Sequence, residues 1–432
     1  MASPVHVKEA VLISPLEPTP NHILQLSALD SQLFVRFTFE YLLVYRARNG
    51  LDKDATTANV KSALGRALVP YYPLAGRVRN RADGLGLEVV CRGQGALFID
   101  AISDCSVSEF EGPPKCREQW RNFLSLQAVD VLKGAPPVVV QLTWLSDGGA
   151  TLATGFNHCL CDGIGSGEFL NSLAELAIGK VGLSELRPIP TWSRHLFMSP
   201  PPFRPSLRNP LSHPEFTSVP DLCGFTPRYL KERLAPTSIT FDGNKLNKLK
   251  KLTKYSCTSF DVLSAHVWRS WARALNLPSN QIVKLVFSVN IRKRVKPSLP
   301  SGYYGNAFVL GCAQTCVRDL IEKGLGHATE LVGKAKERVG DEYVKEVVEL
   351  VSSTRASVDS VGVLIMTQWS RLGLQSVDFG MGRPIHVGPM CWDRYCMLSS
   401  VYNLTDAVKV DLAVPSSAVE EYLHFLRNIC TG

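Results

Sequence analysis

A histidine and an aspartate four residues apart, His158 and Asp162, are the residues whose type and spacing could do chemistry. They follow Thr151–Phe156, an apolar run typical of a strand, and precede residues 164–176, whose apolar side chains recur at helical spacing. An imidazole on such a turn can move a proton near neutral pH, and a carboxylate can orient it. An isolated histidine is more often a structural residue, so both roles remain open from these residues alone.

Three glycines, Gly163, Gly165 and Gly167, begin the segment that follows Asp162. Their spacing matches neither a G-x-x-x-x-G-K-[ST] phosphate loop nor a dinucleotide fingerprint, and no G-x-S-x-G nucleophile turn is present. We therefore expect the glycines to leave room for a ligand to approach the backbone.

Covalent catalysis by a cysteine is a second interpretation of this turn, because Cys159 and Cys161 follow His158 closely. Adjacent side chains in a loop diverge, so covalent Cys–His catalysis is the less favoured alternative. The C-x-C pair and the Cys312/Cys316 pair lack the spacing of zinc ligands, and we expect no metal. Twelve cysteines without a secretory leader are expected to be free thiols.

Composition limits the class of protein. The chain has 432 residues, 45% hydrophobic and 20% charged, with a formal charge of +8, which is typical of a folded protein rather than a disordered one. The N-terminus lacks a secretory signal and no uncharged apolar run could span a membrane, so we expect a cytoplasmic protein. Basic residues are scattered in short clusters, which disfavours nucleic acid but is compatible with a polyphosphate ligand.

The chain divides at a proline-rich stretch, since ten of its 27 prolines lie between Pro188 and Pro227. We expect an N-terminal domain over 1–187, an extended, polyproline-like crossover over 188–235, and a C-terminal domain over 236–432. Both halves alternate strand-like and helix-like segments, which predicts mixed α/β architecture.

The elements expected to position the turn are a β-hairpin and a set of helices and strands in the second half. Residues 137–145 and 150–156, separated by Asp-Gly-Gly, predict a hairpin that leads directly to His158. The second half predicts a helix over Phe260–Leu275, capped by Thr258 or Ser259, and strands over 282–290 and 362–367. A further helix is expected over Gln119–Leu132.

Several segments together resemble the BAHD acyltransferases, the plant acyl-CoA-dependent family. His158–Gly163 is similar to the family motif H-x-x-x-D-G, and Asp378–Gly382, DFGMG, resembles its D-F-G-W-G. Other matching segments occur in the same order along the chain: LSALD, YYPLAGR, Thr258–Phe260, Tyr303–Asn306 and Thr367–Trp369. The resemblance covers nearly the whole chain, and the ordered set is highly specific.

The resemblance implies two similar mixed-sheet α/β domains of the chloramphenicol-acetyltransferase kind, with an active-site channel between them. It implies a monomeric enzyme that transfers a hydroxycinnamoyl, benzoyl or aliphatic group from acyl-CoA, a co-substrate rather than a bound cofactor, to a small alcohol. An amine or polyamine acceptor is the alternative. A non-catalytic binding protein is disfavoured by the intact His158, Asp162 and Trp369.

The resemblance also assigns roles at the site. It makes His158 the general base, and Trp369 with Thr367 the donors to the tetrahedral oxyanion. Asp162 is expected to turn away and pair with an arginine, and Asp378 to form a structural pair with Arg292.

Contacts to CoA are carried over to Thr258, Ser259, Arg292 and Arg294. Met381 stands where the family usually has tryptophan, and we expect it to pack the loop, since methionine adapts to irregular gaps. Arg355 lies near the position of a family arginine that binds shikimate, but its spacing to Trp369 is one residue short, so we infer no such acceptor.

Overall fold

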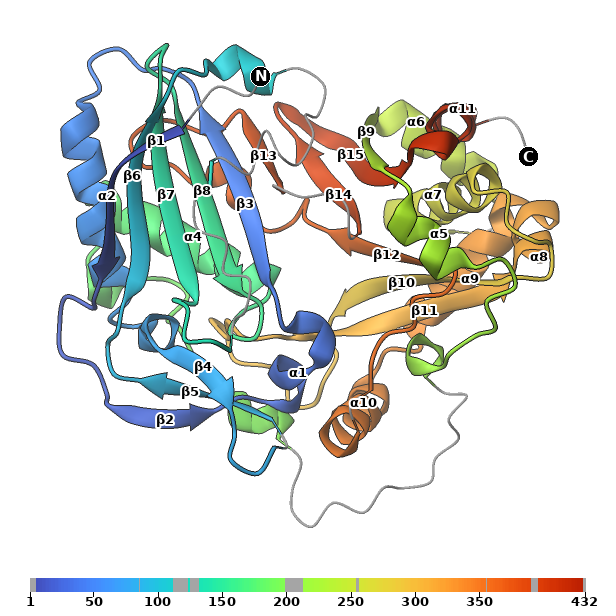
Figure 1. Cartoon of the computed structure of the whole chain (residues 1–432), viewed down its shortest axis with the longest axis horizontal. Coiled ribbons are helices and arrows are strands. Elements are labelled where there is room, and N and C mark those ends of the chain that lie inside the picture. Colours follow the sequence, from blue (N-terminus) through green and yellow to red (C-terminus); the bar gives the residue numbers. More distant parts are fainter. Residues whose placement is uncertain are drawn as a thin grey trace.

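A computed structural model describes residues 5–84, 86–111, 123–124, 132–198, 213–253, 256–354, 356–389 and 395–429. Its strands form two six-stranded sheets and one of three strands, and helices pack beside both large sheets (Figure 1). The mixed α/β fold expected from the sequence is therefore confirmed. Arg355 and most of the helix expected over Gln119–Leu132 lie outside the described residues.

The first sheet carries the predicted hairpin at its centre. Its strands, in spatial order, are β1 (Val5–Ile13), β6 (Ala96–Ser103), β7 (Val138–Leu145), β8 (Ala150–Asn157), β3 (Thr38–Tyr45) and β13 (His386–Pro389). β7 and β8 are buried along their whole length, as a central position requires. One face packs against two amphipathic helices, α2 (Lys53–Ala67) and α4 (Gly163–Ala177).

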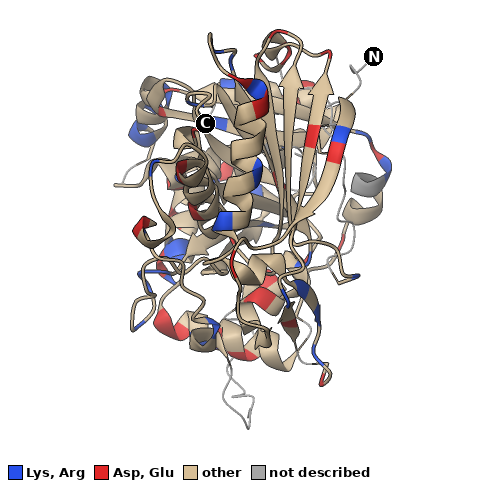
Figure 2. Cartoon of the chain, turned by 90° about the vertical axis from the view of Figure 1, so that its left-hand side faces the viewer, with Lys and Arg blue, Asp and Glu red and all other residues tan. Residues whose placement is uncertain are grey.

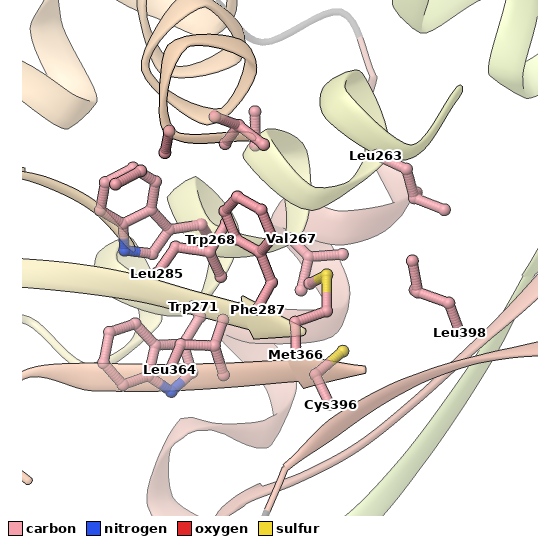
Figure 3. Packing of buried hydrophobic residues seen from close by; sticks show 14 of the residues in the cluster. Leu263, Val267, Trp268, Trp271, Leu285, Phe287, Leu364, Met366, Cys396 and Leu398 are labelled. Carbon is pink, nitrogen blue, oxygen red and sulfur yellow. The ribbon is translucent and has the colours of Figure 1, made fainter. Parts of the chain in front are cut away.

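The second sheet has the same layered plan. Its strands, in spatial order, are β11 (Phe308–Cys316), β10 (Ile282–Asn290), β12 (Val363–Gln368), β14 (Cys396–Val401), β15 (Leu404–Pro415) and β9 (Leu234–Phe241). The helices packed into its core include α6 (Gly243–Lys251), α7 (Ser259–Ala274), α9 (Gly324–Glu337), α10 (Asp341–Ser353) and α11 (Val419–Arg427). Trp268 and Trp271 of α7 lie over Leu285 and Leu364 of the sheet (Figure 3).

The remaining elements are short. They include α1 (Ala28–Ser31), η1 (Leu33–Val35), η2 (Tyr72–Ala75), α8 (Val317–Glu322), and the small sheet of β2 (His22–Gln25), β5 (Leu87–Cys91) and β4 (Arg77–Asn80). Charged side chains of both signs are scattered over helices and loops (Figure 2). In the described part of the chain, no helix is both long enough and apolar enough to cross a membrane.

The two halves of the chain interlock rather than lying side by side as separate units. β13, from the second half, pairs with β3 at the edge of the first sheet, with His386 opposite Val44 and Pro389 opposite Tyr41. The inner face of the first sheet also shares a core cluster with Met397 of β14. A boundary drawn at 188–235 in the sequence therefore does not separate the two sheets in space.

The crossover is more structured than an extended linker in the part that the structure describes. Residues Phe225–Lys231 form helix α5, and Pro214–Phe216 form a 3-10 turn. The buried ammonium of Lys284, on β10, donates to the Thr217 carbonyl, and this hydrogen bond holds the crossover against β10. The expectation of a polyproline-like stretch is wrong here because tertiary packing supplies partners for its backbone.

Candidate active site

The edge of the second sheet explains why distant residues gather near the His158 turn. β10 and β12 are parallel, so Arg292 and Trp369, which follow them, lie at the same edge. β11 is antiparallel to β10 and begins at that edge, directly after Asn306 and Ala307. Hydrogen bonds from this edge reach the turn after β8, and the site therefore lies where the two sheets meet.

His158 is half-buried among aromatic rings. Its ring centroid lies 4.7 Å from Phe39, 5.2 Å from Phe37 and 5.6 Å from Phe308, and its backbone N–H donates to the Phe37 carbonyl at 2.9 Å. Nδ1 is enclosed and makes no hydrogen bond of ordinary geometry. Burial lowers the pKa of His158, although its own backbone carbonyl and the Asp162 carboxylate partly oppose this. The ring is therefore neutral at pH 7 and able to accept a proton.

Asp162 points away from the imidazole and forms the expected ion pair with an arginine. Its two oxygens each accept from Arg292 at 2.9 Å, and they also accept from the backbone N–H groups of Gly165 (2.9 Å) and Ala307 (3.1 Å). Burial raises the pKa of Asp162, but Arg292 and the backbone donors outweigh it and hold this pKa below its usual range. Asp162 also caps α4, so one carboxylate orders the turn and joins the two halves.

The Asp378–Arg292 pair expected from the resemblance is not formed. The Arg292 guanidinium instead donates to the Asp162 carboxylate and to the backbone carbonyls of Tyr303 and Gly305. Asp378 instead accepts from the backbone N–H groups of Gly380 and Gly382, both at 2.8 Å. A tight loop whose own backbone satisfies the carboxylate needs no arginine, which is why the sequence expectation was wrong.

Met381 fills a gap at this loop. Its side chain is 5% exposed and belongs to the core cluster of the first sheet. We expect Met381→Trp to leave turnover within about threefold, while overpacking lowers the free energy of unfolding by about 1–3 kcal/mol. Steady-state kinetics and denaturant unfolding measure the two effects, and a large gain in turnover would contradict a packing role.

The glycines of the turn make room for the protein itself rather than for a ligand. A Cβ on Gly165 would lie 2.0 Å from the Tyr304 carbonyl oxygen, and one on Gly167 would lie 2.4 Å from that of Leu372. Both neighbours belong to the second half of the chain. The sequence expectation is corrected: the glycines let α4 dock closely against the other domain.

The cysteines beside His158 are inert. Cys159 and Cys161 are at most 1% exposed, and burial raises the pKa of the Cys159 thiol to about 12. A neutral buried thiol is a poor nucleophile, so the geometry disfavours Cys–His covalent catalysis. Across the described ranges, no group of three or more His, Cys, Asp or Glu side chains is placed to hold a metal ion.

Trp369 reaches the histidine through a chain of ring contacts. Its ring lies 4.8 Å from Tyr41, which lies 5.5 Å from Phe39, the ring nearest to His158. Its backbone N–H is bonded to the Leu398 carbonyl at 2.8 Å. Thr367, on β12, lies with its hydroxyl 3.5 Å from that of Ser288 on β10. The structure thus places Trp369 in the aromatic cluster and Thr367 on the adjacent strand.

A cleft of about 1780 Å³ lies between the sheets and includes three of the four residues expected to contact CoA. Thr258, Ser259 and Arg294 line it, whereas Arg292 does not and is held by Asp162. The cleft reaches Gln368 and Ser288, which adjoin Thr367. Its lining has three carboxylates and seven cations: Arg46, Lys250, Arg294, Lys336, Arg371, Arg383 and Lys409.

Sequence reasoning gave no individual role to three buried polar residues that surround the turn, Asp30, Arg194 and Asn306. Asn306 donates to the His158 carbonyl at 2.7 Å, and Arg194 donates to the Leu160 carbonyl at 2.6 Å. Two of them belong to the LSALD and YYGN segments, so their motifs were visible although their contacts were not.

Comparison with known proteins assigns the chain to a family. The profile of the Transferase family matches residues 3–420. The chain is 33% identical over 438 residues to the omega-hydroxypalmitate O-feruloyl transferase of Arabidopsis thaliana (97% of this chain, 92% of that protein). It is 34% identical over 444 residues to alcohol acyl transferase 1 allele GSa of Malus domestica (98% and 94%).

A relative that acylates nitrogen is also similar: the chain is 31% identical over 434 residues to the 3'-N-debenzoyl-2'-deoxytaxol N-benzoyltransferase of Taxus canadensis (96% and 95%). Among solved structures, that of vinorine synthase superimposes with a TM-score of 0.76 at 20% identity, covering 96% of each chain, which confirms the expected fold. The chain therefore belongs to the Transferase family, the BAHD acyltransferases, and is an acyltransferase.

Proposed function

We propose that the protein transfers an acyl group from acyl-CoA to the hydroxyl of an apolar or aromatic alcohol, with His158 as the general base. The observation that supports this most is a neutral imidazole packed among aromatic rings, in a chain whose cleft between the sheets is lined by a surplus of cations. The acceptor oxygen attacks the thioester carbonyl directly, His158 takes the hydroxyl proton, and the proton passes to the departing thiolate. No acyl-enzyme forms.

Proton transfer is assigned to Nε2 because Nδ1 is enclosed. A general base can act only in its proton-accepting form, so its pKa must not lie above the operating pH. The lowered pKa of His158 satisfies this at neutral pH. Asp162 is assigned a structural role, since all of its contacts lead away from the imidazole.

Oxyanion stabilisation is assigned to the indole N–H of Trp369 with the hydroxyl of Thr367. The tetrahedral intermediate needs fixed donors where charge develops. Trp369 is anchored by its backbone hydrogen bond to the Leu398 carbonyl and by its ring contact with Tyr41. A donor that is already held in place costs little reorganisation energy when the oxyanion forms.

The basic cleft is the proposed site of CoA, whose phosphates match a surplus of cations. Thr258, which caps α7, Ser259 and Arg294 are proposed contacts. Within the described residues, Lys250, Arg371 and Arg383 line the cleft without forming an ion pair, which leaves their charges available to a phosphate.

The acceptor is proposed to be apolar because of what surrounds His158. Phe308 contacts the imidazole and also Phe34, at 6.1 Å, and both rings pack on an apolar cluster centred on Val286 and Leu310. None of these residues lines the basic cleft. A polyamine would need unpaired carboxylates, whereas the carboxylates acting on His158, Asp162 and Asp30, are both in buried ion pairs. These observations favour oxygen over nitrogen.

The test is a panel of acyl-CoAs against fatty, benzylic and terpenoid alcohols, shikimate, and amines, with products read by mass spectrometry. Ester formation with apolar alcohols supports the proposal. Amide formation as the faster reaction would overturn the choice of acceptor.

Charge in the cleft is tested by Lys250→Gln. We expect KM for acyl-CoA to rise about two- to fivefold with kcat unchanged, because one partly exposed phosphate contact contributes up to about 1 kcal/mol. Lys248→Gln is the matched control, since Lys248 lies on the same helix but does not line the cleft. Equal effects of the two variants would argue against CoA binding at this surface.

A further inference from the structure

The His158–Asp162 turn is held largely by groups from other parts of the chain. The His158 carbonyl accepts from Asn306 Nδ2, in the loop before β11, and the Leu160 carbonyl accepts from Arg194 Nη2, in the crossover. Both donors are fully buried. The backbone of the turn is therefore fixed by side chains that are remote in sequence, not only by its own hydrogen bonds.

Asp30 orients both donors. Its Oδ1 accepts from Nδ2 and from the backbone N–H of Asn306, at 2.8 and 3.1 Å. Its Oδ2 lies 2.9 Å from Arg194 Nε, and this ion pair is completely inaccessible to solvent. Ser27 donates to the same oxygen at 2.7 Å. Separating the partners of a buried charge pair is costly, so Arg194 stays beside Asp30, and the Asp30 carboxylate restricts both donors.

Arg194 is further fixed by three aromatic rings. Its guanidinium carbon lies 4.2 Å from the centroid of Trp192, and 5.0 Å from those of Tyr303 and Tyr304. The guanidinium group is planar and can stack on rings while its N–H groups donate in plane. Here it donates to Leu160 and pairs with Asp30 at the same time.

The Asn306 amide joins this buried pair to the catalytic turn. It donates to the Asp30 carboxylate and to the His158 carbonyl, the backbone group of the proposed base itself. We propose that Asn306, oriented by the Asp30–Arg194 pair, is a positioning residue that sets the orientation of His158. This rests on the proposed role of His158 as the base.

Positioning matters because proton transfer needs a correctly placed imidazole. A misplacement of about 1 Å can lower the rate about 100-fold. The side chain of Asn306 also raises the pKa of His158, against the larger effect of burial. Removal of the Asn306 side chain is therefore expected to change both the rate of transfer and the pH at which His158 becomes protonated and stops acting as a base.

The experiment measures Asn306→Ala in the full-length enzyme. We expect kcat to fall about 10- to 100-fold with KM for acyl-CoA unchanged, and the acid limb of the kcat/KM profile to move to lower pH. Asn306→Ser, which keeps one donor, should recover part of kcat and serves if the alanine variant does not fold. Asn171→Ala is the matched control, because its amide bridges α4 to Gly373 without touching the turn.

The outcomes separate the two proposals. An unchanged acid limb in both Asn306 variants, or an equal loss of kcat in Asn171→Ala, would overturn the positioning role. Full activity in His158→Ala would instead overturn the assignment of the base. Loss of transfer in His158→Ala together with wild-type kinetics in Asn306→Ala would reject only the positioning role.

Discussion

Replacement of His158 by alanine is expected to lower acyl transfer about 10²- to 10⁴-fold, the usual contribution of a positioned general base. The imidazole packs on Phe39 and Phe37 with Nδ1 enclosed, which leaves Nε2 to take the proton. Acyl-CoA affinity should stay near that of the wild type, because His158 does not line the basic cleft. Single-turnover kinetics and equilibrium binding of CoA measure the two quantities.

The matched control is His6→Ala, which removes an exposed histidine from the edge strand β1. It should change neither transfer nor binding. Full transfer by His158→Ala would refute the role of the base, and a parallel loss of CoA binding would show that the variant damages the fold instead. The lowered pKa keeps the wild-type ring neutral at neutral pH, so the alanine variant removes no charge there.

Local sequence patterns predicted the scaffold of this site well. The hairpin and the helix after His158 follow from periodicity and turn residues, and α7 begins and ends within one residue of its expected bounds. β13 was not predicted, because four residues, HVGP, carry no strand periodicity of their own. They become a strand only because β3 offers an unpaired edge.

The partners of the site residues could not be derived from local patterns. Asp162 and Arg292 are 130 residues apart, and Asn306 is 148 residues from His158. Which carboxylate pairs with which arginine depends on the tertiary fold. The family resemblance correctly paired Asp162 with an arginine but gave Arg292 to Asp378, and no spacing rule distinguishes the two. The glycines were misread for the same reason, because their close neighbours lie in the other half of the chain.

Replacement of Asp162 by asparagine is expected to lower the free energy of unfolding by about 3–5 kcal/mol, because Arg292 is left buried without its counter-charge. Asparagine caps a helix about as well as aspartate, so α4 keeps its N-cap and the loss reports on the ion pair. Transfer should fall with it, since the turn carrying His158 loses the bidentate bond to the other half of the chain.

The pH dependence of this loss has a definite sign. The pKa of Asp162 is depressed in the folded state, so its contribution is complete above the unfolded value of about 4 and disappears as pH falls through the folded value. The gap in stability between wild type and Asp162→Asn should therefore be largest near neutral pH and narrow below about pH 4. Denaturant unfolding at several pH values measures this gap.

The chain provides a matched control for Asp162→Asn in Asp242, which caps α6 by accepting from the Lys245 N–H but pairs with no arginine in the described structure. Asp242→Asn should be nearly neutral, because only the cap is involved and asparagine preserves it. If both variants lost the same stability, capping rather than the ion pair would explain the effect. If Asp162→Asn kept full stability but lost transfer, Asp162 would have to act on the chemistry directly, and the separation of roles between His158 and Asp162 would be wrong.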